Sequence, residues 1–481
     1  MSSESKAISP DWKPPGTKRR SWRRWALFLC FLMLFAWAYC YLGTILIQEK
    51  NKIRTGNFQA LYIEATYQAA SFSRGGDEEP VSITSRFTRG LPQVSDGLID
   101  PLWPWLASIY ADEPPDILFE KGKWLNMLLS CSILVVLGIG AAQAFSFSGA
   151  AALILMGGFG VILERSTYYS ADAIHLLLIV LAWLCALSLI RQNHLWLYGI
   201  FGVLLGWALL AKSPVWPLFA GFLMMSVVRT VTSLIYSKRN PATDNLWSQT
   251  NQLVGLAIFF TAFLLVAGPR MTYLAREFED PFFNVSQYMV WLDSPAEAMR
   301  FQESVRESGV GGIPEEERPG LSQFVRQKGL RELFHRGWEG GLAQLRSSMF
   351  SRQGWILFYT FAVFCIVAGI HRWAMWKQNE ETWRVRGTSA RWMLFFLASV
   401  FAVSVFYAGI GNPVVQNNAI MTALFLPILL TFIWISERYR RQLQRTRYEM
   451  LANRIYSGLM LIPIAWISFR IFQAIKTPVA G

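Results

Sequence analysis

The fold of this chain is indicated most clearly by residues 173–211, which read AIHLLLIVLAWLCALSLI, then RQNH, then LWLYGIFGVLLGWALLA. Two apolar runs flank four polar residues, and each run is close to the ~20 residues that carry a helix across a bilayer. Similar runs recur along the chain, so we expect an all-α polytopic membrane protein. The sequence predicts about eleven transmembrane helices, at residues 25–47, 123–144, 148–163, 173–190, 195–211, 214–228, 251–268, 354–371, 392–409, 418–435 and 455–475.

The composition supports this fold class. Hydrophobic residues make up 53% of the 481 residues, and charged residues only 16%. Soluble domains carry about 25% charged residues, so these values exclude a water-soluble enzyme and a disordered chain. The 21 tryptophans suit the interfaces between membrane and water, where their amphipathic rings are enriched.

The net charge of +13 has a topological interpretation. When the N-terminus is placed in the cytosol, the whole positive excess falls on the cytosolic side, chiefly in the tail of residues 1–24 and in the arginines around Arg440. This distribution follows the positive-inside rule. It predicts a multi-pass protein of the plasma (inner) membrane and gives no support for nucleic acid as a partner.

Two long connections are predicted on the outer face, at residues 48–122 and 269–353. They divide the chain into a cytosolic tail (1–24), a transmembrane core (25–268) that includes the first connection, the second connection (269–353), and C-terminal transmembrane helices (354–481). Within these connections Asn57–Ser73 and Arg326–Leu345 are amphipathic, so we expect helices that lie in the membrane interface.

Polar residues gather where these connections meet the predicted spans. Five stretches stand out on the outer side: IEATYQA (63–69), IDPLWPWL (99–106), RSTYYSADAI (165–174), GWALLAKSP (206–214) and GPRMTY (268–273). In their order they resemble the motifs of the C-type glycosyltransferase superfamily, membrane enzymes that use polyprenyl-phosphate sugars as donors. The most similar group contains the protein O-mannosyltransferases and the aminoarabinose transferases.

The resemblance extends over about residues 20–300, and each stretch echoes one family motif. IEATYQA is similar to an Asp-Glu-Ala-Tyr-Tyr motif, and IDPLWPWL to an Asp-Lys-Pro-Pro-Leu-Tyr-Tyr-Trp-Leu motif. RSTYYSADAI resembles an Arg-x-x-x-x-x-Asp-Ala-Leu pattern with one extra residue, and GWALLAKSP a Gly-x-Ala-x-x-Thr-Lys-Gly-Pro pattern. The chain departs from the family at Ile63, where the family has Asp, and at Pro101, where it has Lys.

The resemblance implies a glycosyltransferase that moves a sugar from a polyprenyl-phosphate donor to an acceptor hydroxyl or lipid at the outer membrane face. The acceptor class, whether protein, lipid or glycan, is left open, and membrane lipids are expected partners. The leaving phosphate requires fixed cations, which Lys212, Arg165 and Arg270 can supply. The attacking hydroxyl benefits from a carboxylate base, for which Glu64 and Asp172 are the catalytic candidates.

Further contacts to the substrate are predicted for four residues: Asp100, Tyr67, Trp103 and Tyr169. No metal ligand set has a recognisable spacing, so we expect no obligatory cofactor. Carboxylate oxygens such as those of Glu64 and Asp172 would nevertheless suit Mg²⁺ or Mn²⁺.

Each of these residues also has a purely structural interpretation. Asp172 could act as a helix cap and Lys212 as a charge at a helix end, whereas Trp103 could anchor the chain in the interface. His175 is interpreted as a packing residue.

Two other function classes are compatible with the sequence. A transporter would be expected to have internal repeats and ionisable groups within the membrane, whereas here Arg470 is the main charge inside a span, near its outer end. A non-catalytic relative that binds a lipid-linked sugar is the second alternative, because Ile63 replaces an acidic residue of the family motif.

Overall fold

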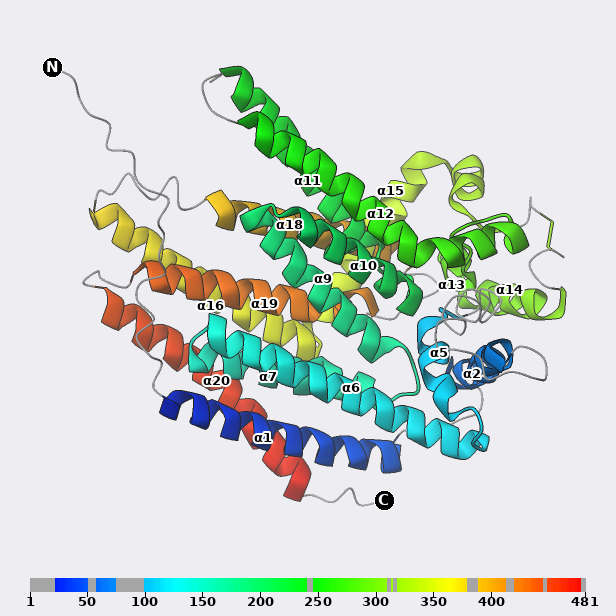
Figure 1. Cartoon of the computed structure of the whole chain (residues 1–481), viewed down its shortest axis with the longest axis horizontal. Coiled ribbons are helices and arrows are strands. Elements are labelled where there is room, and N and C mark those ends of the chain that lie inside the picture. The colour runs from blue at the N-terminus through cyan, green and yellow to red at the C-terminus, as the bar shows by residue number, and fades with distance from the viewer. Residues whose placement is uncertain are drawn as a thin grey trace.

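The computed structural model describes residues 22–50, 58–74, 99–239, 245–308, 313–314, 318–378, 388–411, 419–443 and 448–476. Every regular element in these ranges is a helix, and none of their residues forms a strand. Long helices lie side by side, with shorter helices gathered at one end of the bundle (Figure 1). The predicted all-α architecture is thus confirmed, while residues 1–21 of the predicted cytosolic tail lie outside the described residues.

Among the described residues, eight helices are long and apolar enough to cross a membrane, as is typical of a multi-pass membrane protein. They are α1 (Trp22–Ile45), α6 (Pro115–Ala144), α7 (Phe147–Gly157) with its continuation to Ser166, α9 (Asp172–Gln192), α12 (Asn245–Phe278), α16 (Arg352–Gln378), α18 (Thr388–Ile410) and α20 (Glu449–Lys476). The other three predicted spans fall on α10 (Leu195–Ala211), α11 (Trp216–Arg239) and α19 (Ala419–Gln442). Of these, α10 has only 17 residues, fewer than the ~20 that usually span a bilayer.

The centre of the bundle is the helical run that starts with α7. It passes through a π-helical turn (Gly158–Ile162) into α8 (Leu163–Ser166) without a break. Small residues in its first turns let neighbouring helices approach closely. At Gly149, for example, an added Cβ would come within 2.8 Å of the Glu437 carboxylate of α19. The run is therefore enclosed by other helices on nearly all sides.

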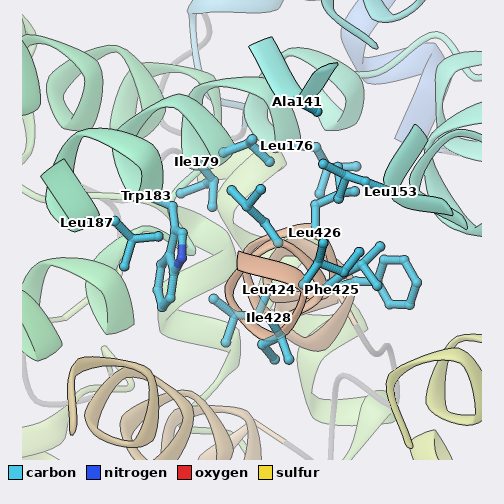
Figure 2. Packing of buried hydrophobic residues seen from close by; sticks show 14 of the residues in the cluster. Ala141, Leu153, Leu176, Ile179, Trp183, Leu187, Leu424, Phe425, Leu426 and Ile428 are labelled. Carbon is cyan, nitrogen blue, oxygen red and sulfur yellow. The ribbon is translucent and has the colours of Figure 1, made fainter. Parts of the chain in front are cut away.

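The largest hydrophobic core of the described residues draws on most of the long helices, and one part of it lies between α7, α9 and α19. Figure 2 shows Leu176, Ile179 and Trp183 of α9 near the α19 residues Leu424–Ile428. Trp183 has no exposed surface, and its indole N–H donates to Thr431 Oγ1 at 2.7 Å. This bond satisfies the only polar group of the indole ring, so a tryptophan can be buried at the centre of the bundle.

An antiparallel pair of helices brings the ends of two predicted motifs together. Asn193, in the left-handed conformation with a φ of 49°, ends α9, and α10 then runs back along it. The start of α9 and the end of α10 consequently lie at the same end of the bundle. α10 also packs tightly against α12, because a Cβ at Gly202 would lie 2.4 Å from the Phe259 carbonyl oxygen.

The first long connection contributes helices α2 (Phe58–Arg74) and α5 (Leu102–Ala107), followed by a 3-10 turn at Ser108–Tyr110. α2 matches the amphipathic helix predicted at Asn57–Ser73. Its apolar face packs on α5 and on the link between α8 and α9, with Trp103 and Tyr169 at the centre of this cluster. These helices therefore cover the end of the bundle at which α9 begins (Figure 1).

The second long connection contributes α13 (Val285–Met289), α14 (Pro295–Ser308) and α15 (Leu321–Met349). α15 contains the predicted amphipathic segment Arg326–Leu345. One face of α15 packs on α18 so closely that a Cβ at Gly341 would lie 2.5 Å from the Val405 carbonyl oxygen. Beside this face, Phe334 and Trp338 are exposed, as expected for a helix in the membrane interface.

Candidate functional site

Asp172 and Lys212 form the centre of a charged cluster. Asp172 is the first residue of α9 and Lys212 follows the last residue of α10, so the antiparallel pair brings them together. Lys212 Nζ donates to Asp172 Oδ1 at 2.5 Å, and Arg165 Nη1 lies 3.6 Å from Asp172 Oδ2. The two cations favour the ionised carboxylate. The three side chains are between 19% and 35% exposed, so water or a ligand can reach them.

Asp100 lies beside this pair and joins two distant parts of the chain. Its Oδ2 accepts a hydrogen bond from the Ser213 backbone N–H at 3.1 Å, and Ser213 directly follows Lys212. Its Oδ1 accepts from the Asn284 side-chain amide at 2.9 Å. The carboxylate is thus held between the end of α10 and the segment that precedes α13.

The environment of Asp100 changes its acidity. Burial raises the pKa of this carboxyl group from 3.8 to about 6 and outweighs four opposing influences: the Ser213 N–H, the charges of Arg270 and Lys212, and the Asn284 amide. Asp100 can therefore exchange a proton close to neutral pH, whereas Asp172 is held ionised by its two cations.

Arg270 supplies a third cation. It lies in α12 directly after Pro269, is 6% exposed, and its guanidinium is 5.4 Å from the centre of the Tyr273 ring. Its charge acts on Asp100. The structure thus brings together five of the predicted site residues, which come from four separate stretches: Asp100, Arg165, Asp172, Lys212 and Arg270.

Three aromatic residues were predicted to bind substrate, and two of them are buried beside this cluster. Trp103 and Tyr169 have no exposed surface, and their rings meet edge to face with 5.8 Å between centres. The Tyr169 hydroxyl is hydrogen-bonded to the Thr66 hydroxyl at 2.8 Å. Both rings therefore form the packed support of the site. Tyr67 anchors α2 instead, because its hydroxyl donates to the Glu113 carbonyl at 2.8 Å.

Glu64 lies apart from the charged cluster. It is on the exposed side of α2, whereas its neighbours Ile63 and Ala65 are buried. Within the described ranges, no hydrogen bond or ion pair joins it to Asp172, Lys212 or the other charged residues of the cluster. Its predicted catalytic role stays a prediction that this arrangement does not favour.

Three residues of the site were not predicted as site residues from the sequence: Tyr62, Ser213 and Asn284. Burial raises the pKa of the Tyr62 hydroxyl well above its usual range, and the negative charges of Asp100 and Asp172 raise it further. Tyr62 directly precedes the IEATYQA stretch and Ser213 lies within GWALLAKSP, so local sequence could have indicated both. Asn284 lies beyond the predicted motifs, and the Asn-x-Ser triplet that it begins does not indicate a contact with Asp100.

Two buried polar atoms near the acids have no hydrogen-bond partner among the described residues: Trp103 Nε1 and His175 Nε2. Such atoms are uncommon in folded proteins, because the free energy that it costs to remove water from them is not offset by a new hydrogen bond. The described residues contain no group of three or more His, Cys, Asp or Glu side chains that could hold a metal ion. The expectation that no cofactor is obligatory, with Mg²⁺ or Mn²⁺ as a possible ligand of the carboxylates, stays a prediction.

No known protein family matches this sequence, and no curated protein is significantly similar to it. The interpretation of the site therefore depends on its own geometry. Two carboxylates in different environments face three cations at one end of a membrane-type bundle. This arrangement can bind an anion and can take up a proton in the same place.

Proposed function

We propose that this chain is an integral-membrane glycosyltransferase that moves a sugar from a polyprenyl-phosphate donor to an acceptor hydroxyl or lipid. It would span the plasma (inner) membrane eleven times, with its N-terminus in the cytosol and the site on the outer face. The observation that carries the proposal is the convergence of Asp100, Asp172, Lys212, Arg165 and Arg270 on one end of the bundle. The same five residues lie in the stretches of sequence that resemble the motifs of C-type glycosyltransferases.

The charges of the site suit this chemistry. Three cations face two carboxylates, so the site carries one net positive charge when both acids are ionised. A polyprenyl-phosphate sugar is a phosphodiester with one negative charge, which this surplus would neutralise. Lys212, Arg165 and Arg270 would hold the phosphate, and the prenyl chain would remain in the bilayer beside the helix ends.

We assign Asp100 as the general base, in place of Glu64. In the transfer step, the acceptor oxygen forms a bond to the anomeric carbon while the bond from that carbon to the phosphate oxygen breaks. The bonding electrons leave with the phosphate, and the acceptor proton passes to Asp100. Protonation of Asp100 raises the net charge of the site by one as the leaving phosphate gains one negative charge, so the cluster stays balanced.

Release of undecaprenyl phosphate by the purified protein tests the proposal. Membranes or nanodiscs would be loaded with undecaprenyl phosphate that carries mannose, glucose, arabinose or aminoarabinose, and lipid products would be measured by mass spectrometry. We expect release from at least one donor and a loss of about 10²–10⁴-fold in Asp100→Asn. Glu277→Gln is the matched control, because Glu277 is an exposed carboxylate on α12 near the same end. A wild-type protein that neither binds nor cleaves any of these donors would overturn the proposal.

One observation favours a second candidate function. If the family chemistry requires the acid of the IEATYQA stretch, the exposed position of Glu64 favours a protein that binds the lipid-linked sugar without transferring it. Donor binding without release of undecaprenyl phosphate, in the wild-type protein and in Asp100→Asn alike, would identify that case.

A further inference from the structure

His175 connects the two helices that carry the central ion pair. It lies on α9 one turn after Asp172, is 3% exposed, and faces α10. Its Nδ1 is 3.3 Å from the Ala208 carbonyl oxygen, which also accepts the backbone N–H of Lys212 at 2.9 Å. Because a carbonyl oxygen only accepts, Nδ1 carries the proton of this bond.

The other ring nitrogen is then an acceptor. In a neutral imidazole only one nitrogen is protonated, so Nε2 presents a lone pair. Nε2 is buried and has no partner among the described residues. Asp172 and Lys212 act on the ring through their charges. The ionised Asp172 has no proton to donate, and Lys212 Nζ donates to Asp172 instead.

The other buried atom near the acids that has no partner among the described residues has the opposite character. Trp103 Nε1–H is a donor, has no exposed surface, and lies three residues after Asp100 in the first turn of α5. Each acid of the site is thus followed, three residues later, by a residue with a buried polar atom that lacks a partner among the described residues. A sugar offers hydroxyl groups that both donate and accept hydrogen bonds.

We propose that His175 Nε2 accepts a hydrogen bond from a hydroxyl of the donor sugar, on a ring carbon close to the anomeric carbon. The inference rests on the proposed function, because it needs the donor phosphate on Lys212. His175 would then determine which sugars bind, in contrast to the packing role that the sequence suggested. It is a specificity residue that touches the sugar and takes no proton in the transfer.

Two substitutions separate the roles of the two ring nitrogens. In His175→Asn, the amide nitrogen can replace Nδ1 as the donor to Ala208, while the acceptor at the Nε2 position is lost. In His175→Gln, the amide oxygen can replace Nε2 as the acceptor, while the bond to Ala208 is lost. Both variants keep an uncharged polar side chain of moderate size, so they form a matched pair.

The measurement is the Kd for undecaprenyl phosphate with and without sugar, in detergent or nanodiscs. The sugar would be the one that the wild-type protein binds best, together with its 2-deoxy analogue. We expect His175→Asn to bind the complete donor about three- to tenfold more weakly and to bind undecaprenyl phosphate unchanged. His175→Gln should keep the wild-type preference for the complete donor over undecaprenyl phosphate and over the 2-deoxy donor.

The control results distinguish the possible failures. If His175→Asn binds both lipids as the wild type does, or loses both equally, His175 does not contact the sugar and the inference is wrong while the proposed function stands. If the wild-type protein binds undecaprenyl phosphate and its sugar derivatives no better than a neutral prenol, the proposed function itself fails, and this sugar contact with it.

Discussion

Two of the charged clusters among the described residues lie at opposite ends of the helical run from α7 to α8, and they differ in how completely they are closed. One begins at Ser146, directly before α7, and the other includes Arg165 in α8. In the first cluster, Glu437 of α19 accepts hydrogen bonds from the Ser146 backbone N–H at 2.8 Å and from the Ser146 hydroxyl. Arg440 donates twice to the same carboxylate, at 2.7 and 3.1 Å, and once to Asn453.

This first cluster is closed: it has one acid, Glu437, one base, Arg440, and little access to water. The side chains of Glu437 and Arg440 are 2% and 13% exposed. The open cluster around Asp172 has three cations for two acids and side chains that are up to 35% exposed. A balanced, buried pair fixes helices relative to one another, whereas a partly exposed excess of cations is suited to binding an anion. We therefore assign a structural role to the first cluster and a functional role to the second.

The largest expected effect tests the structural side of this contrast. Glu437→Gln should lower the free energy of unfolding by about 3–5 kcal/mol, because it leaves the buried Arg440 guanidinium without its counter-charge. Thermal and denaturant unfolding in detergent would measure the loss. The sugar-transfer rate per folded molecule should not change. A stable Glu437→Gln protein with impaired transfer would reverse our assignment of the two clusters.

The next effect tests the functional side. Lys212→Met should reduce transfer by about 10²–10³-fold, because a fixed cation at the leaving phosphate is lost. Stability should change little, since Asp172 is partly exposed and keeps Arg165. The assay is release of undecaprenyl phosphate, with Lys121→Met as the control. Lys121 pairs with Glu113 at 2.5 Å, outside the open cluster. Equal losses in the two variants would contradict a specific role for Lys212.

A third prediction concerns the helix contact that supports the open cluster. Gly202→Ala should destabilise the protein by about 1–3 kcal/mol, because its methyl group would collide with the Phe259 backbone and separate α10 from α12. Gly199→Ala on the same helix is the control, since its Cβ would meet only Ile258 at an ordinary 3.5 Å. Unfolding curves of both variants measure the difference. Equal free energies of unfolding for the two variants would show that α10 and α12 accommodate the methyl group at position 202 without a loss of stability.

The smallest effect concerns pH. With the pKa of Asp100 at about 6, transfer should fall about tenfold per pH unit as the pH drops below 6, because the base becomes protonated. Stability should change in the opposite direction. The folded state holds this proton more tightly than the unfolded chain, whose pKa is 3.8, so stability decreases as the pH rises from 3.8 through about 6. A pH–rate profile without this acidic limb would exclude Asp100 as the base.

The sequence predicted the helices that carry the open cluster better than it predicted the contacts between distant residues of that cluster. Asp172 and Lys212 could be paired in advance because two adjacent apolar runs with a short polar link form an antiparallel pair, and the two ends far from the link must then meet. α2 could be predicted from its apolar periodicity. The same periodicity placed Glu64 outside the apolar face of α2, where the structure has it, whereas its catalytic role was predicted from the resemblance to a family motif and stays a prediction.

The remaining features depend on contacts between distant parts of the chain. Asn284 reaches Asp100 across 184 residues, and nothing in its local sequence reveals that contact. The role of Trp103 was similarly hidden, because a tryptophan near a predicted helix end is equally compatible with the membrane interface, with a ligand or with a buried core. Only the packing of α5 against α2 and the α8–α9 link decides between them.

The hydrogen bond from Asn284 to Asp100 has a consequence for any cell that attaches N-linked glycans. Asn284, Val285 and Ser286 form an acceptor triplet for oligosaccharyl transfer, yet the amide nitrogen that would carry the glycan is 2.9 Å from the Asp100 carboxylate, and Asn284 is only 6% exposed. Attachment before folding would sever the bond between the two long connections. With the proposed orientation, which places Asn284 on the outer side, a eukaryotic expression host should therefore yield two populations, of which the glycosylated one lacks the assembled site.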